Sequence, residues 1–333
     1  MAIKHDRLLA KNIPVESESI GFRLDKFLIK AKESIDKTVG DFSRARMQNL
    51  IKQGLIKVNG QSRSPHYKLK KNDLVNIKFF ALAPVKTRVE KNSKLADLPL
   101  KIVSETSEYL IIDKPAGVIT HGKSDQALVL TDILIKKYPR LKNLGDDPSR
   151  PGIIHRLDKD VSGLMVIAKT RASFLDLKKQ FQRRMVNKEY TALAYGKIDQ
   201  PSAMINFPIR RAKQGYKMAA LPLTDFGRLN QVGKPAETYF KVIKNYINYT
   251  LLKIKINTGR THQIRVHLFA YNHPLVGDNI YGTAKTRLLN KKLNLNRVFL
   301  VADKLGFSDL SGQQQTFSIG LPDDLKKILQ LIK

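Results

Sequence analysis

The sequence predicts an α+β protein that has a small N-terminal module and a larger domain built on a mostly antiparallel mixed sheet. Near the N-terminal end, two short basic helical patterns precede a β-hairpin pattern. Farther along the chain, strand patterns outnumber helical patterns and often follow one another directly. Direct succession of strands favours antiparallel pairing over a doubly wound parallel sheet.

The module is expected over residues 18–80, after a flexible tail over 1–17 that is polar and lacks a clear period. Two sets of apolar residues recur at helical spacing: Leu24, Phe27, Leu28 and Ala31, then Met47, Leu50 and Ile51. Two strand patterns complete the module, over 55–58 and 74–80. We expect its helices to offer three cations to phosphate groups: Arg44, Arg46 and Lys52.

A linker is expected over 81–98, where Pro84 and scattered lysines interrupt any periodicity. The larger domain then covers residues 99–333. Six strand patterns recur in it, over 100–104, 109–113, 164–168, 190–195, 238–243 and 250–256. Three helical patterns accompany them, over 128–138, 170–184 and 261–271.

The net charge of the chain is strongly positive. Sixty Lys and Arg residues against 29 Asp and Glu leave a formal charge of +31 at pH 7. So large a surplus destabilises a compact chain by self-repulsion unless a polyanion neutralises it. No basic amphipathic helix of the kind that lies on membranes stands out. A nucleic acid is therefore the expected partner, and a membrane is not.

The sequence contains no cysteine, which excludes disulfides, thiolate zinc sites and thiol nucleophiles. The N-terminal stretch lacks the apolar core of a signal peptide, and no apolar run approaches the roughly 20 residues that span a bilayer. A cytoplasmic location is therefore expected. No metal site is expected either, because no carboxylate accompanies His262 and His267 at zinc-ligand spacing.

One short pattern points to a different class of protein. Residues 117–124, GVITHGKS, match the phosphate-binding loop GxxxxGKS of nucleotide-hydrolysing enzymes. That loop needs a flexible backbone, whereas Val118, Ile119 and Thr120 are stiff β-branched residues that favour a strand. No later apolar run ends in the acidic residue that a magnesium site would need. We therefore expect a strand and a turn that line a groove.

The segment Pro151–Gly163, PGIIHRLDKDVSG, sets the carboxylate of Asp158 among cations just before a buried strand pattern. Asp158 lies close in sequence to His155, Arg156 and Lys159. Neighbouring cations hold an aspartate ionised, as a nucleophile or a base requires. Considered alone, the segment favours a salt-bridged structural loop, because structural ion pairs surround carboxylates in the same way.

A second segment, Thr258–His267, shifts the balance toward function. It opens a helical pattern whose first two turns are crowded with donors: Arg260, His262, Gln263 and Arg265. Backbone amides and the helix dipole also favour anions at a helix start. A solvated helix face usually mixes both signs of charge, but no acidic residue follows here until Asp278. The segment is therefore predicted to bind a phosphate or a partner carboxylate such as Asp158.

At these two segments the chain resembles the RluA superfamily of large-subunit ribosomal RNA pseudouridine synthases. HRLDKDVSGLMVIAKT is similar to the catalytic segment of that family, and GRTHQIRVH followed by HPLVGDNIYG is similar to its third motif. DKPAGVITH resembles a family strand, which explains the GxxxxGKS letters. FSRARMQNLIKQGLIKVNG resembles the αL-type RNA-binding module of several members. RPGIIHRLDKD, PIRRAKQGYKMA and GKPAETYFKV most resemble the synthase D type.

The resemblance covers residues 18–325 and implies a fold and a set of residue roles. The larger domain would be a pseudouridine synthase catalytic domain, with Asp158 as its catalytic carboxylate and Arg265 as the ion-pair partner of that carboxylate. Tyr190 would stack on the target base, and Arg156 would enter the RNA stack where the flipped uridine leaves. Further contacts with RNA are expected from His155, Arg260, His262 and Gln263. The family pattern is not matched at Val161, Leu300–Ala302 and Phe307–Asp309.

The implied reaction is the isomerisation of uridine to pseudouridine in large-subunit ribosomal RNA, free or within a pre-ribosomal particle, by a monomeric enzyme. It carries in no group and oxidises nothing, so neither a cofactor nor a metal is expected. One carboxylate suits isomerisation, whereas hydrolytic glycosidases typically need two. Asp158 could attack or stabilise the sugar centre, or abstract a neighbouring sugar proton. The alternatives are a synthase that acts on a different RNA and a non-catalytic RNA-binding factor of ribosome assembly.

Overall fold

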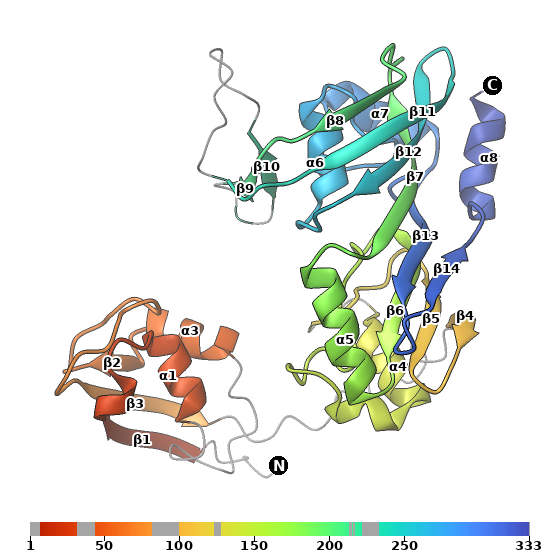
Figure 1. The fold of residues 1–333 in the computed structure, drawn as a ribbon. Helices are drawn as coiled ribbons and strands as arrows, with labels where there is room; N and C mark the ends of the chain where they lie inside the picture. The colour runs from red at the N-terminus through yellow and green to blue at the C-terminus, as the bar shows by residue number, and fades with distance from the viewer. Residues whose placement is uncertain are drawn as a thin grey trace, which may run out of the picture. The chain divides into compact units, whose positions relative to one another are not determined.

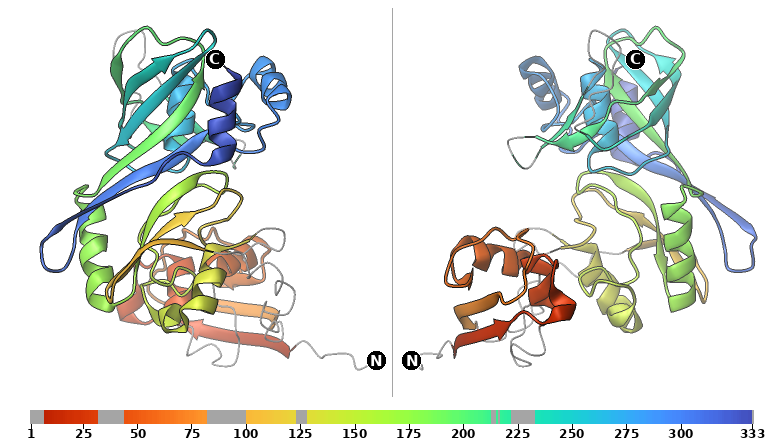
Figure 2. Two further views of the ribbon diagram at one scale, coloured as in Figure 1. Left: turned by 90° about the vertical axis from the view of Figure 1, so that its right-hand side faces the viewer. Right: turned by 60° about the vertical axis from the view of Figure 1, so that its left-hand side comes forward.

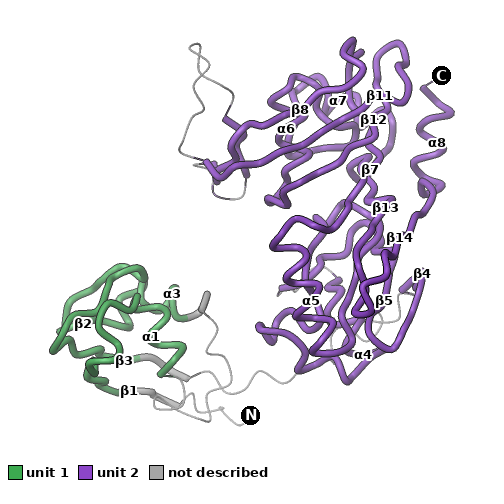
Figure 3. The backbone as a smooth tube through the Cα atoms, viewed as in Figure 1, with its two compact units in different colours: residues 1–93 green, residues 94–333 purple. Residues whose placement is uncertain are grey.

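The computed structural model describes residues 7–31, 44–81, 100–122, 128–212, 215, 217–221 and 233–332. The chain divides into two compact units, Met1–Ser93 and Lys94–Lys333 (Figure 3). No helix in the described ranges is long and apolar enough to cross a membrane. The predicted linker over 81–98 lies, except for Ala81, outside the described residues.

The first unit combines an antiparallel sheet with short helices (Figure 1). Its described elements are β1 (Arg7–Pro14), η1 (Ser17–Ser19), α1 (Leu24–Lys30), α3 (Arg44–Lys52), β2 (Ile56–Val58) and β3 (Leu74–Ala81). The strands pair in the order β1-β3-β2, and apolar residues of both α-helices pack with β2 and β3 in one core. The helices and hairpin strands predicted for this module are confirmed.

The predicted flexible tail over 1–17 is wrong from the seventh residue onward. Arg7–Pro14 forms β1, which pairs with β3 in a register that sets Ile13 opposite Val75. An edge strand is stabilised by main-chain hydrogen bonds to its neighbour, so its own side chains need little periodicity. The first six residues lie outside the described part of the chain.

The second unit is built on one large sheet. Within the described residues its strands pair in the order β4-β5-β6-β13-β7-β12-β11-β8, and β14 pairs with β13. Only β6 and β13 run parallel among these described pairs. The strands are β4 (Lys101–Glu105), β5 (Tyr109–Lys114), β6 (Ser162–Ala168), β7 (Asn187–Tyr195), β8 (Ser202–Ile205), β11 (Thr238–Asn245), β12 (Tyr249–Ile256), β13 (Leu300–Ser308) and β14 (Gln314–Ser318). The predicted mostly antiparallel mixed sheet is confirmed.

Helices and a small hairpin surround this sheet. The helices are α4 (Leu130–Lys137), η3 (Pro139–Asn143), α5 (Arg171–Gln182), α6 (Gln263–Ala270), α7 (Ala284–Lys292) and α8 (Asp323–Leu331). The hairpin is formed by β9 (Ile209–Arg211) and β10 (Met218–Ala220). The three predicted helical patterns of this domain correspond to α4, α5 and α6.

Helices cover both faces of the sheet because its central strands are apolar on both. Leu252 of β12 belongs to the core that includes α4 and α6, whereas the adjacent Leu251 belongs to a second core with α7 and α8. Successive side chains of a strand point to opposite faces, so the two cores lie on opposite sides. Gln180 at the end of α5 exchanges hydrogen bonds with the backbone of Ser308, and Figures 1 and 2 show α5 beside the β13–β14 hairpin.

The parallel pair β6–β13 approaches most closely at Gly163. This residue has a φ of +128°, and a Cβ there would lie 2.3 Å from the carbonyl oxygen of Ala302. Only glycine tolerates both the backbone conformation and the approach. The segment that carries Asp158 enters the sheet at this point, so the close pairing helps to determine where Asp158 lies.

Helix α6 is attached to β11 by a buried histidine. His267 is fully buried; its Nε2 donates to the carbonyl of Phe207 at 2.8 Å, and its Nδ1 accepts from the Thr238 hydroxyl at 2.9 Å. This pattern requires a neutral ring with its proton on Nε2. Burial lowers the pKa of His267 to about 4, so the neutral ring is the form that the fold stabilises.

Replacing Gly163 by alanine should destabilise the second unit by roughly 3 kcal/mol or more, because the methyl group meets backbone atoms and the positive φ is strained. Gly312→Ala is the matched control, since Gly312 also has a positive φ, +84°, but open space around it. We expect the control to cost on the order of 1 kcal/mol. Urea unfolding followed by circular dichroism measures both; equal losses would contradict the proposed close contact.

The free energy of unfolding should fall as the pH drops from 6.5 to about 4. His267 has a folded-state pKa near 4 against 6.5 when unfolded, so the unfolded chain binds the extra proton in this window. The contribution is on the order of 3 kcal/mol, fully present above pH 6.5. His267→Gln, which retains a donor and an acceptor, should show a shallower pH dependence in urea unfolding. An unchanged slope would show that His267 does not titrate with unfolding.

Candidate active site

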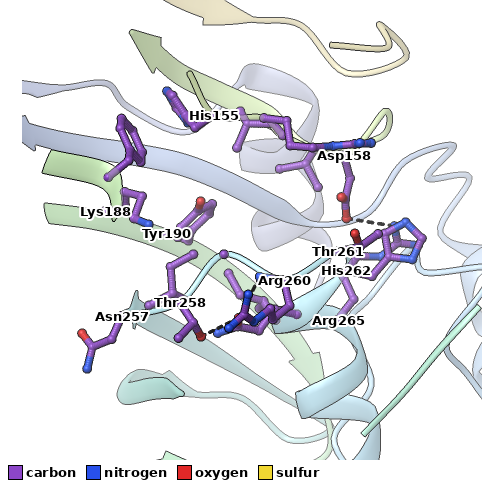
Figure 4. A pocket seen from close by; sticks show the side chains of 18 of the residues that line it. His155, Asp158, Lys188, Tyr190, Asn257, Thr258, Arg260, Thr261, His262 and Arg265 are labelled. Atoms are coloured by element: carbon purple, nitrogen blue, oxygen red, sulfur yellow. Dashed lines mark hydrogen bonds and ion pairs between the residues drawn. The ribbon is translucent and has the colours of Figure 1, made fainter. Parts of the chain in front are cut away.

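A cleft of about 450 Å³ lies on the sheet between the end of α5 and the start of α6 (Figure 4). Its walls come from the segment before β6, the first half of β7, and the turn between β12 and α6. The cleft brings together eight residues that were selected from the sequence: His155, Arg156, Asp158, Tyr190, Arg260, His262, Gln263 and Arg265. Of the three cations predicted in the N-terminal module, Lys52 is exposed, and the side chains of Arg44 and Arg46 lie outside the described part.

Arg265 stands between two carboxylates. Its Nε and Nη2 donate to Asp278 at 2.7 and 2.9 Å, and its Nη1 donates to Oδ2 of Asp158 at 3.2 Å. The side chain of Asp278 is 0% exposed, that of Arg265 3% and that of Asp158 16%. The buried bidentate pair therefore orients the guanidinium, and its remaining edge positions Asp158 at the wall of the cleft.

Asp278 is held by its own turn. The backbone N–H groups of Ile280 and Tyr281 each donate to its Oδ1 at 2.9 Å. The hydroxyl of Tyr281 is in turn 2.8 Å from Nδ1 of His262, and the Tyr281 ring lies 5.3 Å from the guanidinium of Arg265. In the sequence, Asp278 stands out only as the first acid after a run of donors, and its pairing with Arg265 is visible only in the tertiary structure.

The backbone around Asp158 is held by the segment that matched GxxxxGKS. The Thr120 hydroxyl donates to the carbonyl of Leu157 at 2.7 Å, and the amide of Gly117 donates to the carbonyl of Lys159 at 2.8 Å. Gly117 lies in a turn with a φ of +84°, and Ile119 forms an isolated parallel bridge with Val129. The predicted turn is therefore present, but the described residues 117–122 form no strand and do not line the cleft. Residues 123–127, which include the end of the match, lie outside the described part.

Lys114 supports the same segment from inside the protein. It is fully buried, and its Nζ donates to the carbonyls of Pro115 and Val118 at 2.8 Å each and to that of Lys159 at 3.3 Å. Burial lowers the pKa of Lys114 to about 7, partly opposed by the charge of Asp158. Three carbonyl acceptors match the three donors of an ammonium group, so Lys114 connects the two loops that meet beneath Asp158.

Tyr190 forms part of the cleft wall from β7. It is 7% exposed and lies in the main core cluster with its ring adjoining the cleft. Burial, and then the negative charge of Asp158, raise the pKa of its hydroxyl. The phenol is therefore neutral at physiological pH, and its ring offers an apolar surface on which a base can stack.

His155 is neutral and packed against the protein. Its ring stacks on Phe181 with centroids 4.6 Å apart, and its Nε2 accepts from the amide of Val166 at 3.1 Å. Burial, together with the nearby charge of Lys188, lowers its pKa to about 3. The accepting nitrogen leaves a proton on Nδ1. His155 thus joins the segment before β6 to β6 itself while it lines the cleft.

Gln263 uses both ends of its amide within the protein. Its Oε1 accepts from the Thr258 hydroxyl at 2.7 Å and from the amide of Arg260 at 3.0 Å, and its Nε2 donates to the carbonyl of Glu237 and the hydroxyl of Thr238. We therefore expect Gln263 to hold the turn before α6 in place of the predicted contact with RNA. His262, beside it, has a left-handed φ of 55°.

The cations at the mouth of the cleft are more accessible. Arg156 and Arg184 are exposed, and Arg260 is half-buried with its Nε bonded to the carbonyl of Pro235. Arg184 was not selected from the sequence, nor was the half-buried Lys188, which lines the cleft next to Tyr190. Among the residues described, no group of three or more His, Asp or Glu is arranged to hold a metal ion.

Sequence models of two families match the chain. One, described as RNA pseudouridylate synthase, matches residues 108–270, and the other, described as S4 domain, matches residues 22–75. The first match includes Asp158, Tyr190 and Arg265. The second falls within the module that the sequence predicted over 18–80.

Solved structures with the same fold include human proteins. The structure of human RNA pseudouridylate synthase domain containing 1 is 26% identical with a TM-score of 0.54, over 69% of this chain and 87% of that one. The structure of human RNA pseudouridylate synthase domain containing 4 has the same fold. It is 24% identical with a TM-score of 0.56, over 70% of this chain and 92% of that one.

Relatives of known family are similar over nearly the whole chain. A protein of Aquifex aeolicus named uncharacterized RNA pseudouridine synthase is 34% identical over 92% of this chain and 92% of its own length. The ribosomal large subunit pseudouridine synthase D of Zymomonas mobilis is 32% identical over 97% of each chain. The chain therefore belongs to the RNA pseudouridylate synthase family and is an RNA-modifying isomerase with an S4 domain at its N-terminal end.

Proposed function

We propose that this enzyme isomerises uridines of large-subunit ribosomal RNA in the cleft described above, with Asp158 as its catalytic carboxylate and without a cofactor. The observation that carries the proposal is the position of Asp158, a partly exposed carboxylate paired with Arg265, which is itself paired with the buried Asp278. The relative named ribosomal large subunit pseudouridine synthase D supports ribosomal RNA as the substrate.

The chemistry needs few groups. The bond between N1 of uracil and C1′ of ribose breaks, the base turns, and C5 then bonds to C1′, while C5 loses its proton and N1 gains one. The carboxylate of Asp158 can attack or stabilise C1′, or abstract a neighbouring sugar proton, and the hydrogen bond from Arg265 orients that carboxylate. Tyr190 supplies a ring on which the uracil stacks while it is detached. No group enters or leaves the nucleotide, so these residues suffice.

The target nucleotide must leave its RNA stack to reach Asp158. Arg156, exposed at the mouth of the cleft, is suited to fill the space that the flipped uridine leaves, and Arg184 and Arg260 are suited to contact phosphates. Lys52 of the S4 domain, with Arg44 and Arg46, would add contacts to RNA outside the cleft. One chain holds the complete cleft, so a monomer is sufficient, and a cytoplasmic enzyme would meet ribosomal RNA free or within a pre-ribosomal particle.

Asp158→Asn should abolish pseudouridine formation, with a loss of roughly three orders of magnitude in the single-turnover rate, and should leave RNA affinity nearly unchanged. Large-subunit ribosomal RNA is purified from cells that lack the gene and is treated with the wild-type enzyme or with Asp158→Asn. The pseudouridines that form in it are then mapped. Activity in Asp158→Asn would overturn the assignment. If the wild-type enzyme modifies another RNA but not large-subunit ribosomal RNA, the proposed substrate is wrong.

The same variant distinguishes an assembly factor from an enzyme. If the gene's role is structural, cells that carry Asp158→Asn should assemble ribosomes as the wild type does, while cells with a deletion should not. Sucrose-gradient profiles of the three strains measure this directly.

Asp278→Asn should lower the single-turnover rate more than it weakens RNA binding, because Arg265 loses the charge that orients it. It should also destabilise the fold by about 3 kcal/mol, since a buried guanidinium is left without its ion-pair partner. Asp199→Asn serves as the control, because that side chain is 85% exposed. A loss of RNA affinity with an unchanged rate would contradict the positioning role of Asp278.

A further inference from the structure

Lys188 is the only lysine among the described residues that line the cleft. It lies on β7 two residues before Tyr190, so both side chains project from the same face of the strand. Its ammonium is 5.5 Å from the centroid of the Phe181 ring, and it is half-buried. In Figure 4, Lys188 and Tyr190 lie on one side of the cleft and the Asp158–Arg265 pair on the other.

The arginines of the cleft are paired with carboxylates, exposed to water or, in the case of the half-buried Arg260, hydrogen-bonded through Nε to the carbonyl of Pro235. Arg265 is paired with two carboxylates, and Arg156 and Arg184 are exposed at the mouth. Within the described ranges, no carboxylate forms an ion pair with Lys188. A half-buried ammonium without a counter-ion is unfavourable, and burial lowers its pKa. Such a charge is retained where a reaction uses it.

The isomerisation creates a transient negative charge on the uracil base while it lies in the cleft. When the bond between N1 and C1′ breaks, its electron pair stays with the uracil, which becomes a monoanion delocalised over N1 and the carbonyl oxygens. This holds for each of the three roles considered for Asp158. The turned base then donates an electron pair from C5 to C1′, C5 loses its proton, and N1 gains one. The atoms balance, and no further reactant is required.

Asp158 and Arg265 together do not stabilise that anion. The carboxylate repels it, and the guanidinium is shared between Asp158 and Asp278. A base stacked on Tyr190 would instead lie next to the ammonium of Lys188. A fixed positive charge in a site from which water is largely excluded stabilises developing negative charge far more than it would in bulk solvent.

We propose that Lys188 is a catalytic residue that stabilises the detached uracil anion while the base turns on Tyr190. The ammonium keeps its proton throughout, because its role is that of a fixed charge. The assignment rests on the proposed function, in that it takes this cleft as the active site. Phe181 contributes by holding the ammonium at its ring face, where a cation is attracted.

Four variants test the role of Lys188: Lys188→Met and Lys188→Gln remove the charge, Lys188→Arg retains it, and Arg184→Met removes a cation at the mouth. Single-turnover rates and RNA affinities are measured with large-subunit ribosomal RNA from cells that lack the gene. Removing the charge should lower the rate by about 10²- to 10³-fold with little change in affinity. Lys188→Arg should recover much of the rate. Arg184→Met should weaken binding and leave the rate of the bound complex unchanged.

A second RNA separates charge stabilisation from a structural role. Fluorine at C5 makes the detached uracil anion more stable, so the loss in Lys188→Met should be smaller on 5-fluorouridine RNA, measured as consumption of 5-fluorouridine. Equal losses on both RNAs, or a wild-type rate in Lys188→Met, would overturn the proposal. If Lys188→Met fails to fold by circular dichroism, Lys188→Gln gives the same comparison.

Two controls complete the design. Lys255→Met, on the adjacent strand β12, should behave as wild type, because Lys255 is exposed and does not line the cleft. Asp158→Asn is assayed on the same RNA. If Asp158→Asn remains active, the proposed function fails; if it is inactive while Lys188→Met is fully active, only the role of Lys188 fails.

Discussion

The buried ion pair between Arg265 and Asp278 is the interaction on which the rest of the site depends. A guanidinium that is 3% exposed is tolerated only when it is paired and hydrogen-bonded. Asp278 meets this requirement through two bonds and leaves the third edge of the guanidinium for Asp158. The position of Asp158, the proposed catalytic carboxylate, therefore depends on helix α6, on the turn that follows it, and on the segment before β6.

The elements that carry these three residues are attached to the sheet by buried polar contacts. His267 and Gln263 connect α6 to β11, and Thr120 and Lys114 hold the backbone on either side of Asp158. Gly163 lets that segment enter the sheet beside β13. Packed elements hold side chains in this way within the narrow range of positions and orientations that catalysis requires. The GxxxxGKS letters belong to this support, because Gly117 and Thr120 hydrogen-bond to the backbone of the segment that carries Asp158.

Charge is distributed unevenly around the cleft. The formal +31 of the chain favours RNA in general, but exposed arginines at the mouth are screened by water and contribute to binding more than to chemistry. Inside the cleft, His155 and Tyr190 are neutral because burial disfavours their charged forms. The buried ion pair with Asp278 neutralises the positive charge of Arg265. The half-buried ammonium of Lys188 is the charge that we propose acts on the uracil anion.

The sequence by itself determined the α+β class, the strands and helices with strong periodicity, and eight of the residues that meet in the cleft. These follow from local patterns, since apolar spacing is a property of each segment and the two motifs hold most of the reactive groups. Only the tertiary structure decided that Arg7–Pro14 is a strand, because its stability comes from pairing with β3. It likewise assigned Gln263 to internal hydrogen bonds and paired Asp278 with Arg265. Long-range partners and burial decide what a polar side chain can do, and neither is visible in the residues next to it in the chain.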